Sequence, residues 1–224
     1  MQVLIGAGLL LIVLGLFTLF SYKAPHGMKA MGALAGAACA SFLVEAFHSS
    51  FFGNVLNIEF LKKVGDANGS LGGVAAAILV PLALGVSPVY SVLIGLSCSG
   101  LGILPGFIAG YLMSFVVKFL EEKLPSGLDL IVIIVVATPL TRIIGDFTAP
   151  VVDSTLLKIG QVLIASANSN PITMGIILGG IITVVATAPL SSMALTAMLG
   201  LTGAPMAIGA LSVFGSSFLN RSEE

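Results

Sequence analysis

The sequence predicts an all-α fold: a polytopic bundle of transmembrane helices, some of them broken by Pro or Gly or folded back as re-entrant hairpins. Hydrophobic residues make up 57% of the 224 residues and charged residues only 8%, whereas a soluble domain carries roughly 25% charged residues. The apolar runs are continuous, while a membrane β-barrel would show short segments of alternating polarity. We expect about seven to eight membrane segments in one integral membrane domain that covers residues 1–224.

Composition also excludes several classes of function. The net charge of −1 does not favour nucleic acid as a partner. Cys39 and Cys98 lie in apolar runs without CxxC or metal-ligand spacing, so we expect buried, unreactive thiols and no bound metal or other cofactor. Phosphate-loop, zinc and nucleotide motifs do not occur, so an ATP-driven pump is excluded as an activity of this chain alone. No catalytic residue is assigned.

The first two apolar segments are predicted to be membrane-spanning helices. Residues 3–20 are close to the roughly 20 residues that a helix needs to cross the hydrocarbon core. This segment lacks a basic start and a polar cleavage site, so it is predicted to be a retained helix rather than a signal peptide. Residues 28–47 form the second predicted span, and its many Gly and Ala residues favour close helix packing.

Glu45 lies near the end of the second predicted span. A carboxylate in hydrocarbon costs on the order of 3 kcal/mol, so Glu45 should face protein, water or solute, or else reach the headgroups from the helix end. The following stretch, residues 49–70, mixes polar and apolar side chains. This mixture is typical of a helix in the membrane interface or of a loop that covers the protein.

The middle of the chain predicts two spans, or one span with shorter broken pieces. Residues 71–120 are mostly apolar, and Pro and Gly predict breaks near Pro88 and at residues 100–105. The next apolar segment, residues 130–144, contains Arg142, with Asp146 four positions later. On a helix these two side chains share a face and can pair. The pair is either a salt bridge that anchors the end of a span or part of a functional site.

The stretch over residues 170–201 is expected to organise the chain. It follows an amphipathic segment, residues 151–167, and its apolar run is interrupted by Pro189, Ser191 and Ser192. Proline lacks the N–H that a continuous helix needs, and a broken backbone at membrane depth must be satisfied by protein or water. Small polar residues at such a break suit a transporter site. A packed kink or a turn at the membrane surface is the alternative.

The run over residues 174–203, MGIILGGIITVVATAPLSSMALTAMLGLTG, resembles the EIIC permease family of the bacterial phosphotransferase system. It is similar to the branch that includes perfringolysin-regulator-like proteins, which has Pro-[Leu/Ile]-Ser-Ser and a Leu-Gly-Leu-[Ser/Thr]-Gly turn. The run over residues 106–152 is similar in layout to the segment between the scaffold and substrate halves of EIIC proteins. The likeness covers residues 105–203.

The resemblance implies a multi-pass protein of the bacterial cytoplasmic (inner) membrane, a homodimer in the lipid bilayer, that binds a sugar or polyol at a broken-helix site. In the phosphotransferase system a separate EIIB domain phosphorylates the solute during uptake. We expect no EIIA or EIIB domain in this chain, so any phosphotransferase activity would require separate EIIA and EIIB partners.

The sequence supports three functional hypotheses. The first is an EIIC-type transport subunit whose site for a small polar solute uses groups that both donate and accept hydrogen bonds, with Glu45 or Asp146 as polar anchor. The second is a non-transporting regulator or structural subunit of a larger complex. The third is an ion-coupled secondary transporter whose coupling proton is carried by Glu45, Asp146 or Asp153. The predicted solute-binding residues of the first hypothesis, besides the two acids, are Thr187, Pro189, Ser191, Ser192, Asn168 and Asn170.

Overall fold

The computed structural model describes residues 2–125, 127–152, 154, 161, 165, 172, 175, 176, 178 and 179, and its described elements are all helical. The chain divides into two compact units, one of residues 1–35 with 153–224 and the other of residues 36–152. The predicted all-α class is therefore confirmed for the described residues.

Helix α1 (Gln2–Lys23) and the start of α2 (Gly27–Ala38) belong to the first unit. They confirm the two predicted N-terminal helices. The short turn between them has His26 in the left-handed region, with φ of 55°. At the end of α1 the hydroxyl of Ser21 donates to the carbonyl of Phe17 at 2.8 Å, so this polar side chain is satisfied within its own helix. The crossing of the membrane by α1 stays a prediction.

The second helix is longer than the sequence predicts. Helix α2 continues through the π-helical segments η1 (Cys39–Leu43) and η2 (Ala46–Val55), and residues Gly27–Asn54 form one candidate span of 28 residues. The predicted end at residue 47 was wrong, because the next polar side chain stays within the helix: His48 Nδ1 lies 3.1 Å from Val44 O. Within the predicted span, Ser41 Oγ likewise donates to Ala37 O at 2.7 Å.

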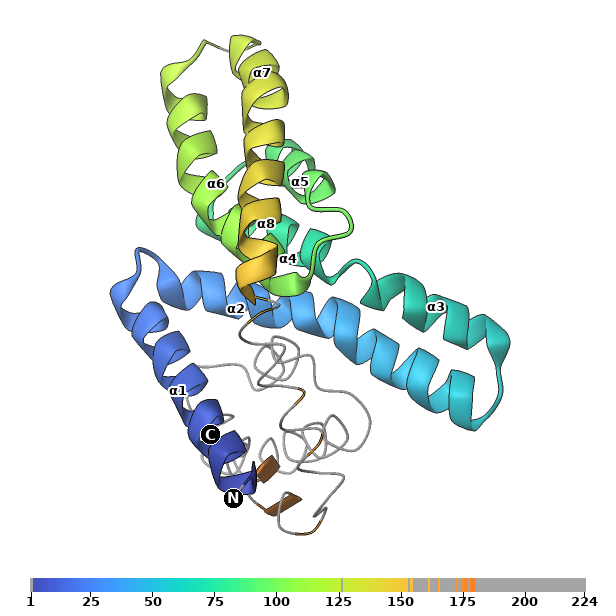
Figure 1. Cartoon of the computed structure of the whole chain (residues 1–224). Helices are drawn as coiled ribbons and strands as arrows, with labels where there is room; N and C mark the ends of the chain where they lie inside the picture. The colour runs from blue at the N-terminus through green and yellow to red at the C-terminus, as the bar shows by residue number, and fades with distance from the viewer. Residues whose placement is uncertain are drawn as a thin grey trace, which may run out of the picture. The chain divides into compact units, whose positions relative to one another are not determined.

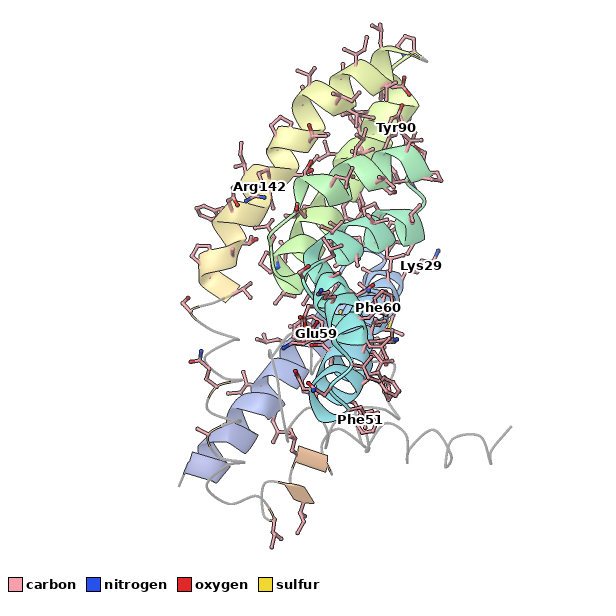
Figure 2. All side chains as sticks on the ribbon, turned by 90° about the vertical axis from the view of Figure 1, so that its right-hand side faces the viewer. Lys29, Phe51, Glu59, Phe60, Tyr90 and Arg142 are labelled. Atoms are coloured by element: carbon pink, nitrogen blue, oxygen red, sulfur yellow. The ribbon has the colours of Figure 1, made fainter. Side chains whose placement is uncertain are left out.

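Helix α3 (Glu59–Gly69) folds back against η2 and forms a helical hairpin with it (Figure 1). Residues 59–69 are therefore helical, which is one of the two predicted alternatives, and they do not form a loop. Helix α3 is bent by 52° against the following α4 (Gly72–Leu84), so the two form either a broken span or a re-entrant loop. Phe60 on α3 is 72% exposed, and Figure 2 shows it beside Glu59.

We expect α3 to lie at the membrane interface, and a Phe60→Trp variant tests this. The chain contains no Trp, so the new indole is a single fluorescent reporter. Amphipathic helices with aromatic side chains settle at headgroup level, so lipids brominated near the headgroup should quench the indole more than lipids brominated near the chain end. Phe119→Trp, at an exposed position of a candidate span, is the matched reporter. A water-like emission that neither lipid quenches would contradict the prediction.

Four helices form the bundle of the second unit. They are α4, α5 (Pro88–Ser97), α6 (Ile103–Lys123) and α8 (Thr138–Val152), the last preceded by α7 (Leu128–Val132) and η3 (Ile133–Ala137) (Figure 1). The breaks fall at residues 85–87 and 98–102, close to the predicted breaks. The core of the bundle comprises Ala77, Val86, Tyr90, Ile94, Cys98, Leu101, Ala109, Met113, Val117, Ile133 and Ala137.

Small residues let α4 and α6 approach closely. A Cβ added at Gly106 would meet the backbone of Gly73, and one added at Gly110 would lie 2.8 Å from the Cα of Ala77. Lipid gives no hydrophobic drive for helices to associate, so such close contact supplies the dispersion energy that holds membrane helices together. The spacing of four residues on both helices produces a continuous seam.

The described residues contain three candidate membrane spans, Gly27–Asn54, Ile103–Lys123 and Leu128–Val152, or up to four if α3 with α4 counts as one. The predicted count of seven to eight segments stays a prediction. Helix α5 has 10 residues, about 15 Å of helix, and is too short to cross a core of about 30 Å.

The prediction of two buried thiols was half right. Cys98 is buried, whereas Cys39 is exposed. An apolar run in a membrane helix does not fix burial inside the protein, because one face of the helix can point to lipid.

Candidate functional site

Most of the predicted site lies outside the described residues. This applies to Asn168, Asn170, Thr187, Pro189, Ser191 and Ser192, and also to Asp153. Glu45 and Asp146 are described, and they belong to two different groups of contacts in the second unit.

Arg142 and Asp146 pair on α8, as their spacing predicts. Arg142 Nε donates to Asp146 Oδ2 at 3.0 Å, and the two side chains are 46% and 54% exposed. The candidate span around them ends at Val152, ten residues after Arg142. The pair is therefore not at the end of the helix, and an exposed charge within an apolar span is costly unless water, protein or solute meets it.

Arg142 also forms a hydrogen bond to the turn between α5 and α6. Its Nη1 donates to the backbone carbonyl of Ser99 at 2.6 Å. The turn passes through Gly100, whose φ of 77° favours glycine. Gly145 on α8 lies against the side chain of Leu101, so α8 contacts the turn at a second point.

The first turn of α5 and the preceding end of α4 contact side chains from α7 and α6, respectively. Tyr90 Oη donates to Asp129 Oδ2 at 2.6 Å, and Lys118 Nζ donates to the carbonyl of Leu84 at 3.4 Å. The bond to the Asp129 carboxylate raises the pKa of the Tyr90 phenol to about 12, because ionisation would bring a second negative charge beside the first. Tyr90 thus remains a donor at neutral pH. Figure 2 shows Tyr90 and Arg142 at different levels of the bundle.

Glu45 lies in the seam between α3 and the helix that contains η2. Its carboxyl group contacts the position where a Cβ would be at Gly69. One turn further along, Ser49 Oγ donates to Asp66 Oδ1 at 2.5 Å, and Gly65 lies against the backbone of Ser49. The hairpin thus carries two acidic side chains along one seam.

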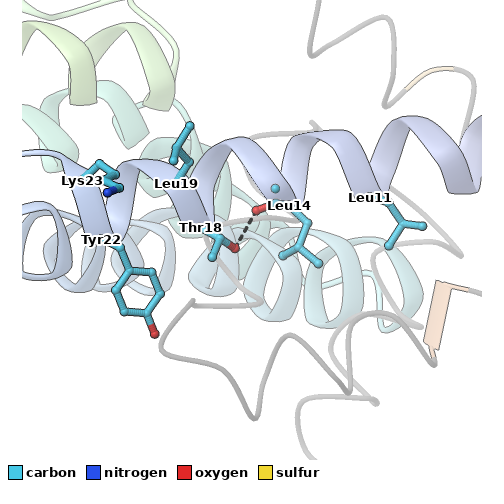
Figure 3. Close-up of a pocket in the computed structure, with 7 residues that line it drawn as sticks. Leu11, Leu14, Thr18, Leu19, Tyr22 and Lys23 are labelled. Atoms are coloured by element: carbon cyan, nitrogen blue, oxygen red, sulfur yellow. Dashed lines mark hydrogen bonds between the residues drawn. The ribbon is translucent and has the colours of Figure 1, made fainter.

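A hollow of about 470 Å³ runs along α1 (Figure 3). Its described wall is mostly apolar, and the hydroxyl of Thr18 is already bonded to the carbonyl of Leu14 at 2.8 Å. The polar ends of Tyr22 and Lys23 lie at one end of the hollow (Figure 3). Such a wall suits a hydrocarbon chain better than a hydroxyl-rich solute, so we do not assign the solute site here. In the part of the chain that the structure describes, no group of three or more His, Cys, Asp and Glu could hold a metal ion.

Sequence reasoning missed three participants of these groups. The carbonyl of Ser99 is brought to Arg142 by tertiary packing, for which the sequence carries no local signal. Asp66 and Gly65 were read only as part of a mixed polar stretch. The spacing of Gly65 and Gly69, a Gly-x-x-x-Gly pattern, could have indicated the packed hairpin.

Comparison with known proteins gives one family. The family model described as "Phosphotransferase system, EIIC" matches residues 28–221, which is most of the chain and extends beyond the stretch on which the resemblance was based. Comparisons with curated proteins and with solved structures found no significant match. A match of this extent shows that the chain belongs to the EIIC family of the phosphotransferase system and is a membrane transporter domain of that family.

Proposed function

We propose that this chain binds a small neutral solute, a sugar or polyol, inside the membrane and translocates it for phosphorylation by partner components. The family supplies the class of activity. The observation that carries the site is the exposed Arg142–Asp146 pair within a candidate span. Such a pair is costly against lipid, whereas hydroxyl groups can both donate to its carboxylate and accept from its guanidinium.

The remaining predicted solute-binding residues enter the proposal from the sequence alone. From the sequence, we propose Glu45 or Asp146 as the polar anchor and the hydroxyl and amide groups around Pro189 as further solute-binding groups. These groups are Thr187, Ser191, Ser192, Asn168 and Asn170. A single domain over residues 1–224, a homodimeric state, a location in the bacterial inner membrane and separate EIIA- and EIIB-like partners are part of the same proposal.

The double variant Ser191→Ala/Ser192→Ala tests the proposed site. Removing two hydroxyls that contact the solute is expected to weaken binding about 10- to 100-fold, since each lost hydrogen bond costs about 0.5–1.5 kcal/mol. Isothermal titration of the purified protein with a panel of hexoses and hexitols measures this. Ser70→Ala, whose hydroxyl is exposed and bonds to Ala67 within its own turn, is the matched control. Unchanged affinity in the double variant would remove these serines from the site.

Transport itself requires a second measurement. Uptake of the labelled solute into proteoliposomes, with and without an EIIB partner, separates a translocating subunit from a non-transporting one. Uptake that follows an imposed proton gradient and is lost in Asp146→Asn would instead favour the ion-coupled transporter.

A further inference from the structure

We propose that the α5–α6 turn, residues 98–102, and the Arg142–Asp146 pair form one water-accessible site within the membrane region, and that this site contacts the hydroxyl groups of the solute. The proposal rests on the proposed function and deepens it. It assigns a solute-contacting segment on a part of the chain remote in sequence from the break at Pro189. It also assigns Arg142 a role besides pairing with Asp146.

The first support is the polarity of α8. Arg142 and Asp146 lie four residues apart and form a polar stripe on the helix. Ile143 and Phe147, each one residue further along, form an adjacent apolar stripe and are 63% and 78% exposed. Two exposed stripes of opposite character on one helix indicate two environments, one polar and one of lipid. The polar stripe is the side that holds the turn.

The second support is the set of groups that remain accessible at the turn. Ser99 and Gly100 are exposed, whereas their neighbours Cys98 and Leu101 are buried in the bundle core. Gly100 has no side chain to cover its backbone, so a solute can approach the peptide groups directly. The turn thus presents a hydroxyl and backbone groups beside the ion pair.

The third support is the hydrogen-bonding capacity of Arg142. One N–H group of its guanidinium is used by Asp146 and another by the Ser99 carbonyl. The guanidinium carries further donors in a fixed planar fork, and the side chain is half-exposed. The pair has no net charge, so the site suits a neutral hydroxyl-rich molecule. Acceptor and donor groups are both available to orient such a molecule.

Thiol labelling tests the access of water to this site. In a background of Cys39→Ala, a Ser99→Cys variant is treated in vesicles of both orientations with a charged, membrane-impermeant thiol reagent. Ile143→Cys, on the same part of α8 but in the apolar stripe, is the matched control. We expect Ser99→Cys to react at least about tenfold faster, because a thiol in lipid stays protonated and unreactive. Equal, slow labelling of both variants would overturn the proposal.

Cys98 is adjacent to the cysteine introduced at position 99, so the labelling is repeated in a protein that also carries Cys98→Ala. This substitution prevents any reaction between the two adjacent thiols. If this substitution lowers the yield of folded protein, Cys98 is retained and labelling follows reduction. The parent that carries Cys98 alone then gives the background rate, which we expect to be low because this thiol is buried.

Solute protection and an Arg142→Lys variant test the contact with solute. A hexose or hexitol that binds in the titration panel should slow the labelling of Ser99→Cys at least about threefold. Lysine keeps the charge but lacks the planar fork that reaches Asp146 and the Ser99 carbonyl together, so affinity should fall about tenfold without loss of fold. Fast labelling without protection, with unchanged affinity of Arg142→Lys, would overturn the solute contact.

The two levels of the proposal fail in different ways. If the unmodified protein binds no member of the panel, the proposed function fails, while labelling still decides whether the turn meets water. If the unmodified protein binds solute but Ser99→Cys is neither accessible nor protected, the proposed function stands and this inference falls.

Discussion

Gly106→Ala is expected to lower the melting temperature of the purified protein by about 2–12 °C. The Cβ added at residue 106 would lie 2.7 Å from the Cα and carbonyl carbon of Gly73 and would contact its oxygen even more closely. A backbone cannot rotate away as a side chain can, so α4 and α6 must separate. Overpacking of this kind costs about 1–3 kcal/mol, and each kcal/mol shifts the melting temperature of a chain of this size by about 2–4 °C.

Gly32→Ala is the matched control for this prediction. Gly32 also lies within a helix, α2, but a Cβ added there meets nothing within 4 Å. Alanine is favoured over glycine in a helix by about 1 kcal/mol, so this variant should melt at the same temperature or higher. Thermal melts followed by circular dichroism measure both variants. Equal melting temperatures would show that the α4–α6 contact accommodates an added methyl group without loss of stability.

Gly65→Ala is expected to open the η2–α3 hairpin, at a cost of about 2–3 kcal/mol in local stability. Its Cβ would lie 2.7 Å from the Cβ and 2.9 Å from the Cα of Ser49, and would also contact the Ser49 nitrogen. The same displacement would pull Asp66 away from the hydroxyl of Ser49 that it accepts from. The hairpin thus loses both its packing and its polar link.

Gly69→Ala is the control within the same seam. Its Cβ would meet the carboxyl end of Glu45, which is the flexible end of a side chain and can turn aside. We expect a cost of about 1 kcal/mol or less. Hydrogen–deuterium exchange over residues 59–69 reports local opening, and it should accelerate strongly in Gly65→Ala and slightly in Gly69→Ala. Similar exchange in both variants would show that backbone contact at Gly65 does not hold the hairpin.

Sequence patterns predicted the features that depend on neighbours along the chain. The helical class follows from continuous apolar runs, and the breaks at residues 85–87 and 98–102 follow from Pro and Gly. The Arg142–Asp146 pair follows from its spacing on a helix. Each of these needs only local geometry, which a sequence carries directly.

Features that depend on tertiary contacts were missed or misjudged. The second helix was expected to end at residue 47, whereas it continues through η2, where His48 Nδ1 lies 3.1 Å from the carbonyl of Val44 in the same helix. The Ser99 carbonyl reaches Arg142 across 43 residues of sequence. The residues around Pro189 lie outside the described part of the chain, so the broken-helix site there remains a prediction from the sequence.

The hydroxyl groups of the bundle have a mechanical consequence. Ser97, Ser114, Thr141 and Thr148 each donate to a carbonyl of their own helix, so sliding one helix past another leaves these bonds intact. Sliding is instead opposed where a side chain donates a hydrogen bond to the backbone of another element. Arg142 does so to the carbonyl of Ser99, and Lys118 does so to the carbonyl of Leu84. Movement of α6 or α8 relative to α5 would therefore require release of the hydrogen bonds that Arg142 and Lys118 make at the two turns flanking α5.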